Sequence, residues 1–184
     1  MCLINFAFQK ASQYPLILIG NRDEFYSRPT QELHWWTEDG LDILAGKDLK
    51  DGGTWMGMNR QGKFGALTNY RDFRNIKEQA PSRGIIIKKF LSGLPTEEMH
   101  RYLKTQGKLF NGFNIIYGDI NEFFFYSNET DRIQNIYPGI YSLSNALLDT
   151  PWPKQVKSKI AFENAIADIN NESHFFEYMH DTSL

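Results

Sequence analysis

The most informative part of the chain is residues 2–24, CLINFAFQKASQYPLILIGNRDE. Residues 2–9 alternate between apolar and polar side chains roughly as a half-buried strand does, and residues 15–20 form a continuous apolar run that is typical of a buried strand. The polar residues 10–13 between them indicate a turn. This segment therefore predicts a hairpin that returns the chain beside Cys2.

Cys2 is the only cysteine of the 184 residues, and it directly follows Met1. A single cysteine excludes an internal disulfide and any multi-cysteine metal site. Cytosolic processing removes Met1 before a small residue, so we expect Cys2 to carry both a thiol and a free α-amine. These groups titrate near ~8.5 and ~7.7–8.0, so they can exchange a proton at neutral pH. The alternative is that Cys2 is a small buried hydrophobe at the start of a strand.

The charged residues that end the hairpin can support such a nucleophile. Arg22 can lower the pKa of the thiol by favouring the thiolate, and Asp23 can hold or orient the new ammonium group. The competing interpretation is an ordinary surface ion pair at the end of a strand, which contributes little.

Two asparagines stand directly after apolar strand segments. Asn69 follows residues 66–68, and Asn145 follows residues 141–144. Acyl transfer needs neutral donors aimed at a developing oxyanion, and an asparagine amide can supply one. Each asparagine taken alone is also a common turn residue.

The rest of the chain predicts further hairpins separated by helices. The predicted strands are residues 54–58, 63–68, 113–117 and 122–126 and one that ends near Ser144. The predicted helices are residues 84–91, capped by Ser82, a segment from Thr96 to Gly107, and one that begins at residues 151–153. This pattern predicts one α+β domain over residues 1–184, with antiparallel sheets covered by helices.

Composition excludes several classes of partner. Hydrophobic residues make up 41% of the chain and aromatic residues 15%, which favours a packed globule. The formal charge of −2 arises from 20 basic and 22 acidic residues. The chain therefore lacks the excess of positive charge that is typical of nucleic-acid-binding proteins. The apolar run at residues 14–20 is too short for a transmembrane segment, which needs about 20 residues. We therefore expect a cytoplasmic protein.

The sequence predicts neither a metal site nor a cofactor. The histidines have no spacing of three or four residues from one another and none lies beside Cys2; they are His34, His100, His174 and His180. Gly52-Gly53 lacks the ending of a phosphate loop and the spacing of a dinucleotide motif, so we interpret it as a turn before Trp55 that permits a close approach to the Cys2 site.

Several motifs together resemble the NRDE family, also called the transport and Golgi organisation protein 2 family. They are Met1-Cys2, residues 21–25 (NRDEF), 52–55 (GGTW), 67–70 (LTNY), 144–147 (SNAL) and 151–154 (PWPK). The resemblance runs from residue 1 to about residue 160. That family is similar to the N-terminal nucleophile (Ntn) hydrolases, which implies a four-layer αββα sandwich with two antiparallel sheets between helical layers.

Within that superfamily, the choloylglycine hydrolase group cleaves linear amides with an N-terminal cysteine. By motif, the resemblance implies that Cys2 is the nucleophile, that Arg22 and Asp23 support it, and that Asn69 and Asn145 lie near the oxyanion. The implied function is hydrolysis of a non-peptide linear amide or related acyl compound. The alternative is a non-catalytic binding or trafficking protein for a hydrophobic ligand such as a lipid, acyl-CoA or haem.

The end of the chain departs from the family pattern. Members of the family usually continue with further strands and a Tyr-Gly-Thr-Arg motif, whereas this chain stops at Leu184, so we expect it to lack its C-terminal strands. Residues 172–179 predict a final helix with exposed rings, which permits a homo-oligomer.

Overall fold

The computed structural model describes residues 2–72, 74–169 and 173–179. Its contacts divide the chain into two compact units. The first unit comprises Met1–Asp23 and Ile136–Leu184, and the second comprises Glu24–Asn135.

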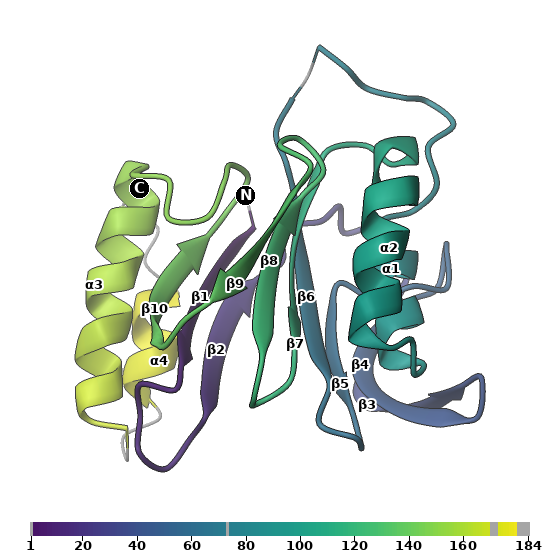
Figure 1. Ribbon diagram of the computed structural model, residues 1–184. Helices are drawn as coiled ribbons and strands as arrows, with labels where there is room; N and C mark the ends of the chain where they lie inside the picture. The colour runs from purple at the N-terminus through teal and green to yellow at the C-terminus, as the bar shows by residue number, and fades with distance from the viewer. Residues whose placement is uncertain (1, 73, 170–172, 180–184) are drawn as a thin grey trace. The chain divides into compact units, whose positions relative to one another are not determined.

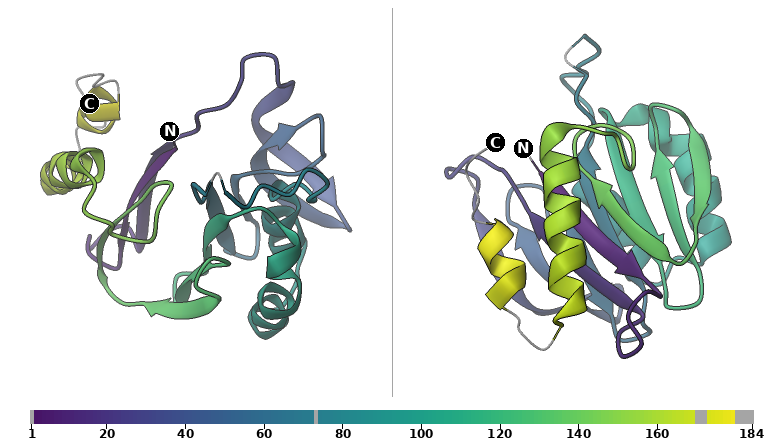
Figure 2. Two further views of the ribbon diagram at one scale, coloured as in Figure 1. Left: turned by 90° about the horizontal axis from the view of Figure 1, so that it is seen from above. Right: turned by 90° about the vertical axis from the view of Figure 1, so that its left-hand side faces the viewer.

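The first unit contains a three-stranded antiparallel sheet in the order β10-β1-β2 (Figure 1). Its elements are β1 (Leu3–Phe8), β2 (Leu16–Asn21), β10 (Gly139–Leu143), α3 (Pro153–Ala167) and α4 (Ser173–Met179). One face of the sheet is covered by α3 and α4, which Figure 2 shows most plainly. Ala7 of β1 packs there against Phe162 and Ala165 of α3 and Phe175 of α4.

The second unit contains a seven-stranded antiparallel sheet in the order β3 to β9, with α1 and α2 on one face (Figure 1). Its strands are β3 (Thr30–Glu38), β4 (Leu41–Asp48), β5 (Met56–Asn59), β6 (Phe64–Asn69), β7 (Phe113–Gly118), β8 (Phe123–Ser127) and β9 (Arg132–Ile136). Its helices are α1 (Gly84–Leu91), α2 (Thr96–Gln106) and the short 3₁₀ helix η1 (Gly107–Leu109). The core of this unit is rich in rings, among them Phe90, Phe113, Tyr117 and Tyr126.

The predicted α+β class with antiparallel sheets is confirmed, as are the three predicted hairpins β1–β2, β5–β6 and β7–β8. The predicted cap at Ser82 is wrong, because Arg83 occupies the N-cap of α1 and no side chain caps that end. Two long strands, β3 and β4, escaped prediction. Most of β3 is exposed and its register shifts between Gln31 and His34, so its apolar pattern is interrupted.

Gly53 approaches the backbone of another segment closely within the second unit, whereas the approach of this turn to the Cys2 site stays a prediction. A Cβ added to Gly53 would lie 2.5 Å from the carbonyl carbon of Gly84, at the start of α1. The Thr54 N–H donates to the Gly84 carbonyl across 3.2 Å. Only a residue without a side chain allows these two backbones to meet, which explains Gly53 as a packing feature.

His100 on α2 lies in a partly buried environment that disfavours its protonated form. Its ring lies edge-on to Phe124, with ring centroids 4.6 Å apart, and its Nε2 is buried without a hydrogen-bond partner. Burial lowers the pKa of His100 below its ordinary value, and the nearby carboxylates of Glu122 and Glu97 offset only part of that effect.

The depressed pKa of His100 predicts a loss of stability in mild acid. Above the unfolded pKa of about 6.5, both states hold a neutral imidazole. As the pH falls below that value, the unfolded chain binds the proton first, so the free energy of unfolding decreases until the folded pKa is reached. Urea unfolding between about pH 7.5 and 5 should show a shallower pH dependence for His100→Phe than for the wild type. Parallel curves would contradict this assignment.

Candidate functional site

The register of the first unit's sheet brings three segments together where its strands end. We call this end of the sheet the edge of the sheet. Leu3 lies opposite Asn21 in the β1–β2 pair, and Ile4 lies opposite Leu143 in the β1–β10 pair. Because both pairs are antiparallel, the residues just beyond these positions meet at the same edge. Cys2, the Arg22-Asp23 pair and the Ser144-Asn145 pair therefore gather there.

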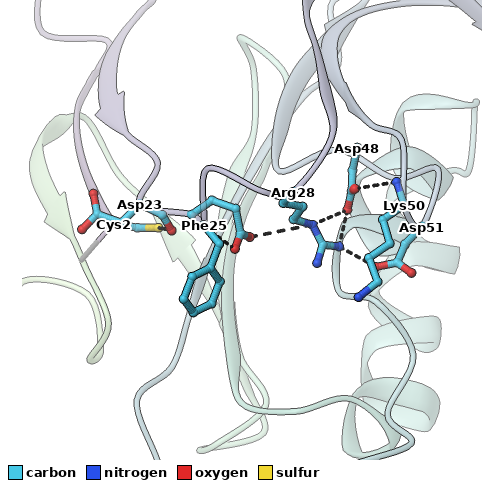
Figure 3. A network of polar contacts seen from close by, with 8 residues as sticks. Cys2, Asp23, Phe25, Arg28, Asp48, Lys50 and Asp51 are labelled. Atoms are coloured by element: carbon cyan, nitrogen blue, oxygen red, sulfur yellow. Dashed lines mark hydrogen bonds and ion pairs between the residues drawn. The ribbon is translucent and has the colours of Figure 1, made fainter.

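Cys2 lies at the centre of this edge and is held on two sides. Its thiol Sγ lies 4.0 Å from the backbone carbonyl oxygen of Asp23, a contact drawn in Figure 3. Its own carbonyl accepts a hydrogen bond of 2.6 Å from Ser144 Oγ, which lies on the β10 side. The residue is only 9% exposed. These contacts fix the backbone of Cys2 and direct its sulfur toward the end of β2.

Asn145 follows Ser144 directly and is 8% exposed. The loop that carries it is tied back to β10 by Asp149, whose backbone N–H donates to the Ser142 carbonyl across 2.8 Å. The Asp149 carboxylate in turn accepts from the Ser142 N–H across 2.9 Å. Lys159 of α3 also contacts this carboxylate, with Nζ and Oδ1 3.0 Å apart. The loop after β10 is therefore anchored to both strand and helix.

The hairpin's charged residues occupy the other side of Cys2. Arg22 is half-buried, whereas Asp23 is exposed. The preceding Asn21 donates from Nδ2 to the backbone carbonyl of Met179 across 3.1 Å, which links the end of β2 to α4. The contact of Asp23 with sulfur uses its backbone carbonyl, so the expected role of its carboxylate stays a prediction.

Asn69 belongs to the second unit, where it ends β6 opposite Phe113. Its side chain is exposed. Its neighbour Thr68 is buried and accepts a hydrogen bond of 3.2 Å from Asn114 Nδ2 on β7. Of the five predicted site residues, four thus lie together in the first unit, while the role predicted for Asn69 at the oxyanion stays a prediction.

A charged cluster in the second unit went unpredicted. Arg28 donates to Asp48 Oδ2 and to Asp51 Oδ2, each across 2.5 Å (Figure 3). Burial of Asp48 favours its neutral form, but the hydrogen bonds from Arg28 and from the Lys50 N–H outweigh this, and its pKa falls below the ordinary value. The cluster fixes the loop that leads into Gly53. Asp48 and Asp51 lie 20 and 23 residues after Arg28, so no local spacing could reveal the cluster.

The described part of the chain offers no ready metal site, since no three His, Cys, Asp or Glu side chains gather there as ligands. Within residues 2–72, 74–169 and 173–179, no helix is long and apolar enough to cross a membrane.

Comparison with solved structures identifies the fold. The chain superposes on the Caenorhabditis elegans ortholog of N-acylethanolamine-hydrolyzing acid amidase with a TM-score of 0.60, covering 98% of this chain and 86% of that one at 12% sequence identity. This likeness confirms the Ntn-hydrolase fold class that the motifs predicted.

Comparison with known sequences identifies the family. The chain is 39% identical over 180 residues to the Mus musculus Transport and Golgi organization 2 homolog, and 40% identical over 183 residues to the Homo sapiens Transport and Golgi organization protein 2 homolog. Both matches cover 90% of this chain and 64% of the relative, so the chain spans less than two thirds of their length. The family model for Transport and Golgi organisation 2 matches residues 1–183, and the chain therefore belongs to that family.

Proposed function

We propose that this chain is a cysteine N-terminal nucleophile hydrolase that acts on a non-peptide linear amide or a related acyl compound. The observation that carries the proposal is the placement of Cys2 between the Asp23 carbonyl and the Ser144 hydroxyl. The single thiol of the chain thus lies at the edge where the charged end of one strand and the asparagine that follows another meet.

The reaction would begin when removal of Met1 exposes the α-amine of Cys2. This amine takes the thiol proton, and the sulfur attacks the substrate carbonyl carbon to form a tetrahedral oxyanion. The side-chain amide of Asn145 donates to that oxyanion. Collapse breaks the C–N bond while the α-ammonium gives its proton to the leaving amine. Water then attacks the resulting thioester, and the acid and the free thiol are released.

The remaining predicted residues take supporting roles in this scheme. Arg22 favours the thiolate, the Asp23 carboxylate holds the ammonium form of the new terminus, and Asn69 supplies a second donor to the oxyanion. We also propose that the protein acts in the cytoplasm, as its sequence predicts. The Caenorhabditis elegans protein that shares the fold is named as an amide hydrolase, which supports an amide as the substrate class.

The second candidate is a binding or trafficking protein that keeps this fold without catalysis. The relatives' names, which refer to transport and Golgi organisation, favour it. A carrier of a lipid or acyl-CoA does not depend on the thiol, whereas a hydrolase does. Unchanged ligand affinity in Cys2→Ala, together with no turnover by the wild type, would select this second candidate.

Replacement of the nucleophile gives the first test. Cys2→Ala should abolish hydrolysis of N-acyl amides and acyl thioesters, because no other thiol in the chain can replace it. Turnover should be followed by release of the amine or thiol. The wild type quenched in acid during turnover should gain the mass of the acyl group, and Cys2→Ala should not. Turnover by Cys2→Ala at the wild-type rate would refute the proposal.

Loss of the hydroxyl that fixes Cys2 gives the second test. Ser144→Ala removes the donor to the Cys2 carbonyl, so kcat should fall roughly 10-fold while KM changes little, since the nucleophile is misplaced and substrate contacts remain. Thr150→Ala is the matched control, because its hydroxyl bonds only within the same loop, to the Leu147 carbonyl at 2.7 Å. Equal effects of the two substitutions would argue against a positioning role for Ser144.

A further inference from the structure

The face of α3 that packs on the sheet is divided into an apolar end and a polar end. Its buried row consists of Gln155, Ser158, Phe162 and Ala165, which are spaced three or four residues apart. Phe162 and Ala165 contact Ala7 in the apolar cluster of the first unit. Gln155 and Ser158, one to two turns earlier, are equally buried but polar.

The sheet presents polar residues to this polar end. Asn5 of β1 lies opposite Ser142 of β10, and the next inward pair along the strands is Ala7 opposite Ile140. Ala7 and Ile140 pack in the cluster under α3. Because side chains two residues apart in a strand share a face, Asn5 and Ser142 also point toward α3. We call Asn5, Ser142, Gln155 and Ser158 the polar cluster.

Three members of the polar cluster have buried polar atoms that form no hydrogen bond with a described protein group. Among the residues that the structure describes, neither the Oδ1 nor the Nδ2 of Asn5 has a hydrogen-bond partner, and the same holds for Ser142 Oγ and Gln155 Oε1. These residues are 0%, 1% and 2% exposed, respectively. Buried polar atoms in native proteins are nearly always satisfied, by protein or by ordered water.

The cluster's other polar groups are already satisfied. Gln155 Nε2 donates to the Ser142 carbonyl across 3.1 Å, and Ser158 Oγ donates to the Gln155 carbonyl across 3.1 Å. The first of these bonds fixes the side-chain amide of Gln155 and directs its Oε1 away from the Ser142 carbonyl. The atoms that need partners are therefore two amide oxygens, one amide NH₂ group and one hydroxyl.

We infer that the polar cluster binds an internal water molecule. A water donates two hydrogen bonds and accepts two, which matches acceptors on Asn5 and Gln155 and donors on Asn5 and Ser142. The four side chains are neutral, which suits water and provides no counter-charge for an ion. This water joins β1, β10 and α3 at the end of the sheet where Cys2 and Ser144 lie, three and two residues from Asn5 and Ser142.

Unfolding experiments distinguish a water-bonded cluster from unpartnered atoms, and they need no enzymatic activity. If a water is bound, Ser142→Ala removes one of its partners and should lower Tm by roughly 2–4 °C. Asn5→Leu removes two and should lower Tm further. If the atoms are unpartnered, both substitutions relieve buried polar groups and raise Tm.

A Tm of Ser142→Ala at or above that of the wild type would overturn the inference, and Ser142→Ala decides the matter if Asn5→Leu fails to fold. A crystal structure of the wild type provides the direct measurement. We expect ordered water density within hydrogen-bond distance of Asn5 and Ser142, and the absence of such density would also overturn the inference.

Discussion

The pairing of β1 with both β2 and β10 is the constraint on which the candidate site depends. Its register places Leu3 opposite Asn21 and Ile4 opposite Leu143, so residues distant in sequence end at one edge of the sheet. A slip of one residue in either pair would turn the inward side chains to the opposite face. The apolar packing of Ala7 under α3 and α4 opposes such a slip and thereby protects the position of Cys2.

The two units are stabilised by different kinds of interaction. The second unit has a large ring-rich core beneath α1 and α2, with a charged cluster at Arg28 that fixes one of its loops. The first unit has a smaller apolar cluster, and polar contacts supply much of the order around Cys2. The Asp149 loop, the Ser144 hydroxyl and the polar cluster all act on β10, which makes that strand the main support of the site.

The sequence predicted the local features of the fold more completely than the long-range ones. The hairpins β1–β2, β5–β6 and β7–β8 follow from apolar runs and turn residues, which are local signals. The strand β3 was missed because an exposed edge strand with a register shift has no clear alternation. The motif comparison, rather than periodicity, supplied the Ntn-hydrolase fold, since periodicity does not determine how hairpins join into sheets.

The proximity of the candidate site residues was predictable to a similar degree. The hairpin predicts that Cys2, Arg22 and Asp23 lie close together, and Asn145 was a candidate because it follows a strand. Ser144 was missed as a contact of Cys2, since its hydrogen bond spans 142 positions and depends on how β10 pairs with β1. Arg28 was missed for the same reason, because its carboxylate partners lie on a different strand and loop.

The proposed reaction requires Cys2 to be a processed and activated nucleophile. Intact mass spectrometry after brief alkylation at a series of pH values tests it most directly, because Cys2 is the only thiol of the chain. We expect a mass that lacks Met1 and rapid labelling that persists well below the ordinary thiol pKa of about 8.5. A retained Met1, or a thiol that reacts only after the protein is unfolded, would contradict it.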